Sequence, residues 1–261
     1  MKWIRAEHAG KQFFAIVDGD EIRPIHGTPF AEYEESGQKL PLKSVKLLPP
    51  VIPPVFYAAG MNYVGHAAEM TGKLDAQKTK IPTRADIGYR ANNALIGNGD
   101  QIVIPKESSG VVQYEPELVV VIGKKARNVK EAEALSYVFG YTIGNDVSER
   151  TWQASDRTLW RAKNSDAFKP MGPWIVTDVD LDALTTRVRL NGHQIAEFPT
   201  NNMVFGVARY ISEITRFITL WPGDVIWMGA DSPTHDMVAG DIVEVEIEGI
   251  GVLRNAVISE T

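Results

Sequence analysis

Two glutamates lie two residues apart, directly ahead of an apolar stretch of the chain. The segment is Tyr114-Glu115-Pro116-Glu117-Leu118, and residues 118–122 are all apolar. Alternate residues of a β-strand point to the same face, so Glu115 and Glu117 would project side by side. Two carboxylates this close repel each other unless a cation or a proton lies between them. The alternative is a strand end exposed to water, which the apolar run that follows disfavours.

A third carboxylate, Asp146, comes at the end of a second apolar stretch, residues 140–147. Three carboxylates at the ends of buried strands would form an oxygen site suited to Mg²⁺, Mn²⁺ or Ca²⁺. The alternative for Asp146 is an N-cap for a helix over residues 149–154, which is a frequent role of aspartate. Residue type and spacing alone leave both interpretations open.

The composition excludes several other chemistries. The 261 residues include no cysteine, which excludes thiolate nucleophiles, thiolate metal sites and disulfides. The five histidines are scattered, and the sequence contains neither a Gly-x-Ser-x-Gly nucleophile motif nor a glycine-rich phosphate loop. A formal net charge of −6 provides no basic field for nucleic acid or an anionic membrane. Any metal would therefore be held by oxygen or imidazole.

The chain also lacks the sequence features of a membrane or secreted protein. No apolar run approaches the ~20 residues that span a bilayer, and residues 1–7 lack the apolar core of a signal peptide. We therefore expect a cytoplasmic protein. Apolar residues make up 44% of the chain, enough for a sizeable core without disulfide or metal staples.

The elements that must position the carboxylates are predicted to be mainly strands. Residues 1–50 read as a small β-rich N-terminal subdomain, with strands over 13–17 and 21–25. Four prolines within residues 49–54 forbid a helix and favour an extended connector. We place the domain boundary there, so that residues 51–261 form the catalytic domain.

In that second domain, strands outnumber helices. We expect strands over 55–59, 101–104, 118–122 and 140–147, and a hairpin over 187–198 around Asn191-Gly192. Gly-Asp pairs at 99–100, 223–224 and 240–241 each read as a turn that feeds a strand. Helices are expected over 63–72, 129–138 and 203–217, the last with an apolar stripe. The predicted class is α+β and β-dominated, a rolled or sandwiched sheet with peripheral helices.

The carboxylate segments and several further blocks resemble the fumarylacetoacetate hydrolase family. Residues 115–123 resemble the Glu-x-Glu metal strand of that family, and residues 140–148 resemble its next metal-binding strand. Further matching blocks occur in order from about residue 55 to 257, including 60–63, 171–174, 188–192, 220–224 and 247–251. The resemblance implies a mixed β-sandwich roll, commonly a homodimer, with Mg²⁺ or Mn²⁺ held by Glu115, Glu117 and Asp146.

The same resemblance implies roles for other residues. His66 would act as a general base oriented by Glu69, three residues further along a candidate helix. Lys163 matches a lysine that faces the metal site, where it would hold a substrate carboxylate or stabilise an oxyanion. Arg150 and Gln153 match positions on the substrate side. Without the resemblance, His66 and Lys163 would be interpreted as ordinary surface residues.

The chain departs from the family at two places near the expected substrate. Ala230 stands where relatives carry a threonine that contacts the substrate carboxylate, and Tyr89-Arg90 stands where they often carry Phe-x-Lys. Loss of that hydroxyl, together with the acidic stretch 231–236, would weaken binding of compact dicarboxylates. We expect either a neutral or cyclic diketone, or an oxo-acid whose carboxylate is held by Lys163, Arg90 or Arg150.

Three functions remain open on the sequence. The first is hydrolysis of a C–C bond in a β-dicarbonyl or 2-oxo-acid substrate, through a metal-stabilised enolate and a water activated by His66 and Glu69. The second is decarboxylation or enol–keto isomerisation of a small oxo-acid with the same metal. The third is a non-catalytic, metal-stabilised binding protein. A family resemblance alone does not fix the reaction. The presence of His66 and Glu69 favours the first function, because hydrolysis needs an activated water.

Overall fold

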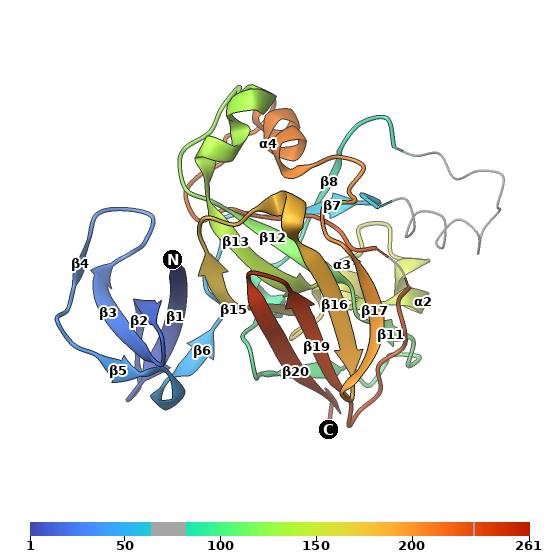
Figure 1. Ribbon diagram of the computed structural model, residues 1–261. Helices are drawn as coiled ribbons and strands as arrows, with labels where there is room; N and C mark the ends of the chain where they lie inside the picture. Colours follow the sequence, from blue (N-terminus) through green and yellow to red (C-terminus); the bar gives the residue numbers. More distant parts are fainter. Residues whose placement is uncertain (64–81, 232) are drawn as a thin grey trace.

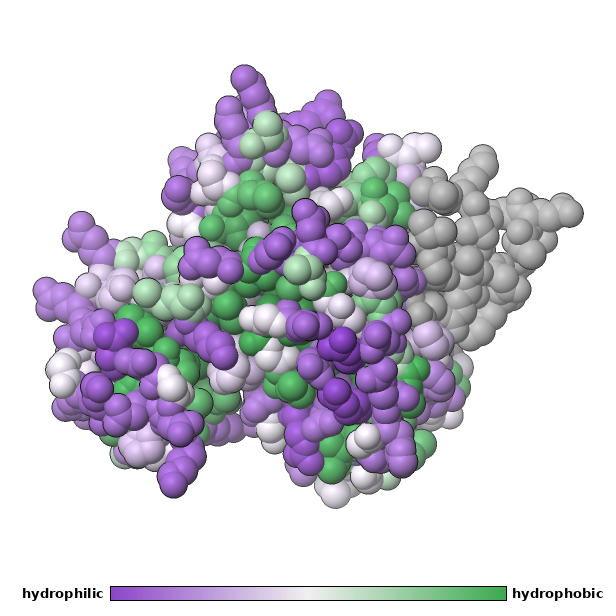
Figure 2. Space-filling model, viewed as in Figure 1, coloured by the Kyte–Doolittle hydropathy of each residue, from purple (hydrophilic) through white to green (hydrophobic). Residues whose placement is uncertain are grey.

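The computed structural model describes residues 1–63, 82–231 and 233–261. In these residues strands dominate, and Figure 1 shows them as two layers with short helices at the periphery. No helix in the described part of the chain is long and apolar enough to cross a membrane. Hydrophilic side chains cover most of the face seen in Figure 2, in keeping with the net charge of −6.

The larger sheet has the strand order β4-β3-β2-β1-β15-β13-β12-β18-β7-β8, with β5, β6 and β9 paired beside it. Its strands are β1 (Lys2–His8), β2 (Lys11–Asp18), β3 (Glu21–Gly27), β4 (Tyr33–Glu35), β5 (Leu40–Pro41), β6 (Lys46–Leu48), β7 (Phe56–Gly60), β8 (Asp86–Tyr89), β9 (Leu95–Ile96), β12 (Pro116–Ile122), β13 (Val138–Asn145), β15 (Lys169–Val176) and β18 (Val225–Trp227). The N-terminal strands join this sheet where Trp3 of β1 pairs with Ile175 of β15. The domain boundary near residue 50 stays a prediction.

The second sheet has five strands in the order β10-β20-β19-β16-β17, and β11 and β14 form a separate two-stranded ribbon. The strands are β10 (Gln101–Ile104), β11 (Val112–Gln113), β14 (Ser148–Glu149), β16 (Thr185–Leu190), β17 (His193–Pro199), β19 (Ile242–Ile247) and β20 (Gly251–Ser259). The predicted hairpin is confirmed: Leu190 pairs with His193 across Asn191 and Gly192, which both have positive φ. The Gly-Asp turns do precede β10, β18 and β19.

Helices are short, and some differ from the prediction. They are α2 (Arg150–Gln153), α3 (Trp160–Asn164), α4 (Val207–Thr215), and the 3₁₀ turns η1 (Leu42–Ser44), η2 (Asn92–Ala94), η3 (Glu131–Tyr137) and η4 (Leu181–Ala183). The helix expected over 129–138 is a 3₁₀ helix, and the one expected over 203–217 begins only after its N-cap, Gly206. Apart from Tyr63, the helix expected over 63–72 lies outside the described residues.

Strand β12 is buried along its whole length because both of its faces are covered. Leu118 and Val120 pack in a core that includes α4, β19 and β20, whereas Val119 and Val121 pack in a second core with Trp227. Strand β13 lies directly beside β12, and a side chain at Gly144 would meet the Trp227 ring at 2.6 Å. These two close-packed strands form the rigid base from which the carboxylates project.

Candidate metal centre and active site

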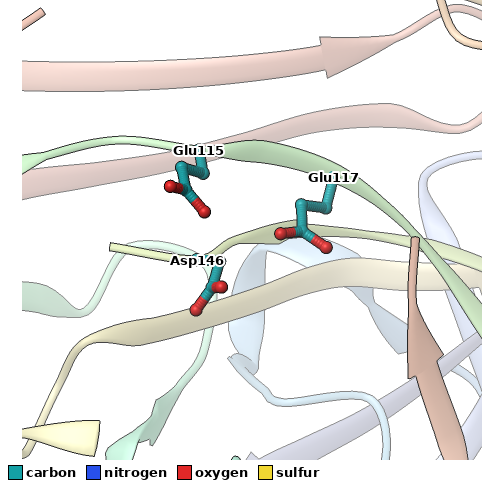
Figure 3. A group of neighbouring side chains, drawn as sticks. All are labelled: Glu115, Glu117 and Asp146. Atoms are coloured by element: carbon teal, nitrogen blue, oxygen red, sulfur yellow. The ribbon is translucent and has the colours of Figure 1, made fainter. Parts of the chain in front are cut away.

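The three predicted carboxylates come together at the ends of β12 and β13. One carboxylate oxygen from each of Glu115, Glu117 and Asp146 lies within 4.8 Å of the others, and all three residues are buried. The side chains of Glu115 and Glu117 project from the same face of the chain, as strand alternation predicts. Asp146 faces them from the end of the neighbouring strand (Figure 3). We refer to these residues as the carboxylate triad.

The alternative interpretations of these residues are wrong. The triad is not at a solvated strand end, because its residues are between 1% and 5% exposed. Asp146 does not cap the following helix: α2 begins after Glu149, whose side chain accepts a hydrogen bond from the Trp152 main-chain N–H. The Asp146 carboxylate is therefore free of the helix terminus and faces the triad.

Cationic side chains surround the triad. Arg90 donates to Asp146, with Nη2 at 2.8 Å from Oδ2. Lys163 Nζ lies 2.5 Å from Glu115 Oε2 and 2.9 Å from Asp146 Oδ2, so it bridges two triad members. Arg150 Nη1 lies 2.6 Å from Glu115 Oε1. Although burial alone would raise it, Arg90, Lys163 and Lys169 hold the pKa of Asp146 well below its usual value.

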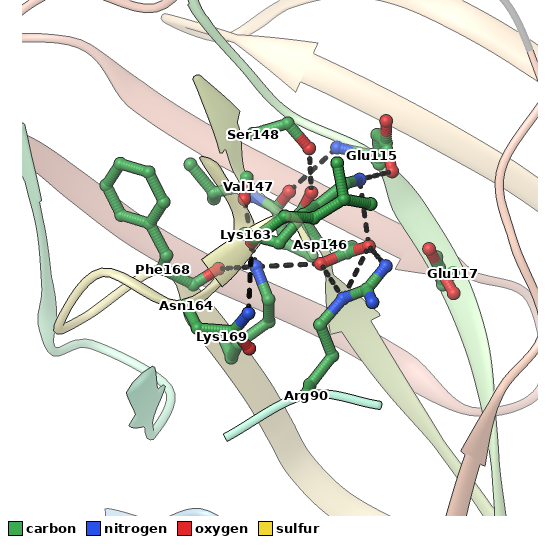
Figure 4. A network of polar contacts seen from close by, with 12 residues as sticks. Arg90, Glu115, Glu117, Asp146, Val147, Ser148, Lys163, Asn164, Phe168 and Lys169 are labelled. Carbon is green, nitrogen blue, oxygen red and sulfur yellow. Dashed lines mark hydrogen bonds and ion pairs between the residues drawn. The ribbon is translucent and has the colours of Figure 1, made fainter. Parts of the chain in front are cut away.

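Lys169 is a fourth cation that the sequence analysis missed. Its side chain is 0% exposed, and Nζ lies 2.7 Å from Asp146 Oδ1, as the dashed contacts in Figure 4 show. Burial lowers the pKa of Lys169 to about 7, against the attraction of Asp146. One feature of the sequence could have indicated it: Lys169 lies between Phe168 and the largely apolar residues 170–176, where a lysine is expected to be buried.

Glu117 is held differently from the other two carboxylates. Its Oε2 accepts a hydrogen bond of 2.7 Å from the main-chain N–H of Gly229, whose φ of 84° suits glycine best. Burial, Asp146 and Glu115 all raise the pKa of Glu117 well above its usual value of 4.5. A cation at the triad would remove that unfavourable repulsion. Three buried, converging carboxylates are hard oxygen donors, so the residues present fit Mg²⁺ or Mn²⁺.

The structure brings most of the predicted substrate residues to the same place. Arg150 Nη1 also donates to Gln153 Oε1 at 2.7 Å, so these residues meet across one turn of α2, as predicted. Ala230 is buried and follows Gly229, the donor to Glu117. Arg90 and Lys163 contact the triad directly. His66 and Glu69 lie outside the described residues.

Two donors beside the triad are uncommitted among the described residues. Arg150 Nη2 is buried and has no hydrogen-bond partner there. Lys163 makes two hydrogen bonds from an ammonium group that has three N–H donors. A buried guanidinium nitrogen without a partner is costly unless a ligand satisfies it. The arrangement therefore suits an anionic ligand that reaches the triad.

Comparison with known proteins identifies the family and the fold. Residues 55–258 match the family model described as fumarylacetoacetate (FAA) hydrolase C-terminal, which covers more than half of the chain. The chain belongs to the fumarylacetoacetate hydrolase family. Residues 1–50 match a second model, described as Rv2993c-like, N-terminal. The predicted family and the β-dominated α+β fold are thus confirmed.

Individual relatives carry several different activities in their names. The chain is 37% identical to protein Rv2993c of Mycobacterium tuberculosis, over 94% of this chain and 93% of that one. It is 34% identical to the mitochondrial oxaloacetate tautomerase Fahd2a of Rattus norvegicus, over 84% and 71%. The structure of 2-hydroxyhepta-2,4-diene-1,7-dioate isomerase from Mycobacterium marinum has a TM-score of 0.88 at 34% identity, covering 100% of this chain and 99% of that one.

A more distant structure shares the fold. Maleylpyruvate hydrolase from Sphingobium sp. SYK-6, in complex with manganese(II) ion and pyruvate, has a TM-score of 0.80 at 24% identity, with each chain covered to 100%. The family thus contains hydrolases, isomerases and tautomerases on one scaffold, and the chain is a member of this group of enzymes. The reaction must be argued from the site.

Proposed function

We propose that the protein is a divalent-metal-dependent hydrolase that cleaves a carbon–carbon bond in a small 2-oxo acid or β-dicarbonyl compound. The observation that carries this proposal is the buried carboxylate triad with uncommitted cationic donors beside it. Glu115, Glu117 and Asp146 would hold Mg²⁺ or Mn²⁺. When bound, that ion would act as a Lewis acid that polarises substrate oxygens and stabilises an enolate.

The charges beside the triad favour an anionic oxo-acid over a neutral diketone. Four cations, Arg90, Arg150, Lys163 and Lys169, already contact the carboxylate triad. A divalent ion would leave the site with an excess of positive charge, and an anionic substrate would balance it. Lys163, and the uncommitted Nη2 of Arg150, would then bind the substrate carboxylate or an oxyanion. These cations would bind the substrate carboxylate in place of the threonine hydroxyl that is missing at Ala230.

Hydrolysis also needs an activated water. In this proposal His66 removes a proton from the water, and Glu69 orients the imidazole and stabilises its protonated form. The proton then passes to the leaving carbon or to solvent, and the acid product carries the oxygen of the water. His66→Ala should lower kcat by about a hundredfold or more and leave metal affinity unchanged, because losing a general base costs ~10²–10⁴-fold. Glu69→Gln should act in the same direction with a smaller effect.

Enol–keto isomerisation or decarboxylation of an oxo-acid is the second candidate. It is favoured by the described cluster, since Lys163, Arg150 and the triad suffice to stabilise an enolate without an activated water. The names of the rat tautomerase and the M. marinum isomerase point the same way. In this case His66→Ala would leave tautomerisation largely intact.

One assay separates the candidates. The protein would be incubated with Mn²⁺ or Mg²⁺ and an acylpyruvate, oxaloacetate or a cyclic diketone, in water enriched in ¹⁸O. Hydrolysis places heavy oxygen in a cleaved acid product, decarboxylation releases CO₂, and tautomerisation leaves the carbon skeleton whole. Cleavage without heavy oxygen, or an intact skeleton with every substrate, would refute the hydrolase. Metal binding without any turnover would indicate a binding protein instead.

A further inference from the structure

Lys169 occupies its position because of strand pairing. It is the first residue of β15, and its main chain pairs with Leu95 of β9. In the antiparallel pair β13–β15, Gly144 lies opposite Met171. The same register, continued by two residues, brings Lys169 beside Asp146. A lysine at this point therefore enters the metal centre from the sheet, whereas Lys163 enters it from α3.

The ammonium group of Lys169 has no donor left for a ligand. Its Nζ lies 2.7 Å from Asp146 Oδ1, 2.8 Å from the carbonyl oxygen of Val147 and 2.9 Å from that of Phe168. An ammonium group has three N–H donors, and here all three are used. Because the side chain is also 0% exposed, Lys169 cannot reach a substrate without breaking these bonds.

Lys169 and Arg90 together fix which way the Asp146 carboxylate faces, and Arg90 Nε lies 3.1 Å from Oδ1 and 3.2 Å from Oδ2. Lys169 holds Oδ1, while Oδ2 shares the Lys163 ammonium with Glu115 Oε2 and so lies on the triad side. Figure 4 shows Lys169 approaching Asp146 from the side away from Glu117. A carboxylate held at one oxygen by a fixed donor presents its other oxygen to an ion with little freedom to rotate.

We propose that Lys169 is a positioning residue of the metal centre: it orients the Asp146 carboxylate toward Glu115 and Glu117 and thereby sets the affinity for the divalent ion without touching the substrate. The inference rests on the triad of the proposed function as the ligand set. It does not depend on which reaction follows.

Positioning and plain charge make opposite predictions for the metal. If Lys169 acted only through its positive charge, it would repel the ion, and its removal would tighten metal binding. If Lys169 positions Asp146, its removal loosens binding, as loss of such a supporting partner typically does by ~10–100-fold. The direction of the change in affinity therefore decides between the two.

The test is calorimetric titration of the protein with Mn²⁺. Lys169→Met, which keeps an unbranched chain and removes the donors, should raise the Kd by about 10–100-fold. At saturating Mn²⁺ its KM for substrate should equal that of the parent. The matched control is Lys163→Met, which should bind Mn²⁺ no more weakly than the parent, because it removes a cation from between two ligands, yet should raise KM.

Each outcome has a defined meaning. A parent that binds no Mn²⁺ refutes the metal-dependent function itself. A parent that binds Mn²⁺ and a Lys169→Met variant that binds it as tightly or more tightly refute the positioning role alone. Circular dichroism and melting of the metal-free variants check folding. Should Lys169→Met fail to fold, Lys169→Gln keeps a donor without the charge: binding no tighter than the parent supports positioning, and tighter binding overturns it.

Discussion

Two groups of buried carboxylates in this molecule differ in how their members are arranged and bonded. Glu115, Glu117 and Asp146 form the triad, whereas Glu149 and Asp156 lie at the starts of α2 and α3. None of the five is more than 9% exposed. Burial by itself therefore does not distinguish a metal ligand from a structural carboxylate.

Both carboxylates at the helix starts accept main-chain N–H bonds. Glu149 is otherwise bonded to hydroxyl groups, whereas Asp156 is also bonded to the Arg161 guanidinium. Glu149 accepts from Ser109 Oγ and Thr151 Oγ1 at 2.7 Å each and from the Trp152 N–H at 2.6 Å. Although burial would raise it, these bonds lower the pKa of Glu149 below its usual value. Such a carboxylate stays ionised without an added cation.

In the triad, Glu115 and Asp146 are bonded to side-chain cations, whereas Glu117 accepts from the Gly229 main-chain N–H. Lys163 and Arg150 contact Glu115, and Glu117 is left with a raised pKa beside two like charges. An ion or a substrate can displace Lys163 and Arg150 from Glu115, whereas a main-chain donor stays in place. We infer that convergence with other carboxylates, more than burial or a cationic partner, distinguishes the triad from the carboxylates at the helix starts.

The largest expected effect is loss of metal binding in Glu117→Ala. Removing one of three hard oxygen ligands should abolish calorimetrically detectable Mn²⁺ binding, while the metal-free protein remains folded. Because the folded-state pKa of Glu117 is raised, its ionisation costs stability as pH rises from 4.5 toward that higher value. The isosteric Glu117→Gln variant should therefore lose that part of the pH dependence. Tight Mn²⁺ binding by Glu117→Ala would refute the ligand assignment.

The triad could be predicted from the sequence because its geometry is local. Glu115 and Glu117 share a face through strand alternation, and Asp146 directly follows a second buried strand. Lys169 could not be predicted in this way, because its contact with Asp146 depends on the register between β13 and β15. Long-range register is set by packing that a local pattern does not contain.

In the fold as well, features set by local sequence could be predicted and features set by long-range pairing could not. Strands such as β10 and the hairpin at Asn191-Gly192 were predicted because turn residues and alternation specify them. The pairing of β1 with β15, which continues one sheet across the predicted boundary, has no local signature. Likewise, the sequence pattern of residues 129–138 predicts a helix but does not specify its type, and η3 is a 3₁₀ helix.

The next largest effect is on stability, in Glu149→Gln. The amide nitrogen of glutamine cannot accept the hydrogen bonds that one carboxylate oxygen accepts, and bonds to a charged group are worth more than neutral ones. We expect a loss of about 2 kcal/mol in the free energy of unfolding, with unchanged Mn²⁺ affinity. Since the folded-state pKa is lowered, this difference is complete above 4.5 and disappears as pH falls through the folded value. Urea unfolding at several pH values would measure this loss. A change in Mn²⁺ affinity instead would contradict the assignment of Glu149 as a structural carboxylate that is separate from the metal centre.

A smaller, substrate-dependent effect is expected in Ala230→Thr. A hydroxyl beside Gly229 would add one hydrogen bond to an anionic substrate, worth ~1.5 kcal/mol or about tenfold in kcat/KM for an acylpyruvate. A neutral β-diketone should gain nothing. The matched control is Ala230→Val, which has the shape of threonine without the hydroxyl. Equal behaviour of the threonine and valine variants would show that this position has no bearing on specificity.

The smallest expected effect is in Asp156→Asn. Asp156 accepts from the N–H groups of Arg161 and Ala162 at the start of α3, and from the Arg161 guanidinium at 2.7 Å. The Arg161 hydrogen bond lowers the pKa of Asp156 below its usual value of 3.8. Loss of this negative charge at a helix start should cost about 1 kcal/mol, fully present above pH 3.8 and lost as pH falls through the folded-state value.

Metal titration then separates Asp156 from the triad in a single series of melts. A ligand that binds only the folded state stabilises it by RT ln(1 + [L]/Kd), so added Mn²⁺ should raise the melting temperature of the parent. Asp156→Asn should gain the same increment from a lower starting point, because its defect lies outside the ion's ligand set. Glu117→Ala should gain none. If Mn²⁺ rescued Asp156→Asn more than the parent, the start of α3 would be coupled to the metal centre, and the distinction between the two groups of carboxylates would fail.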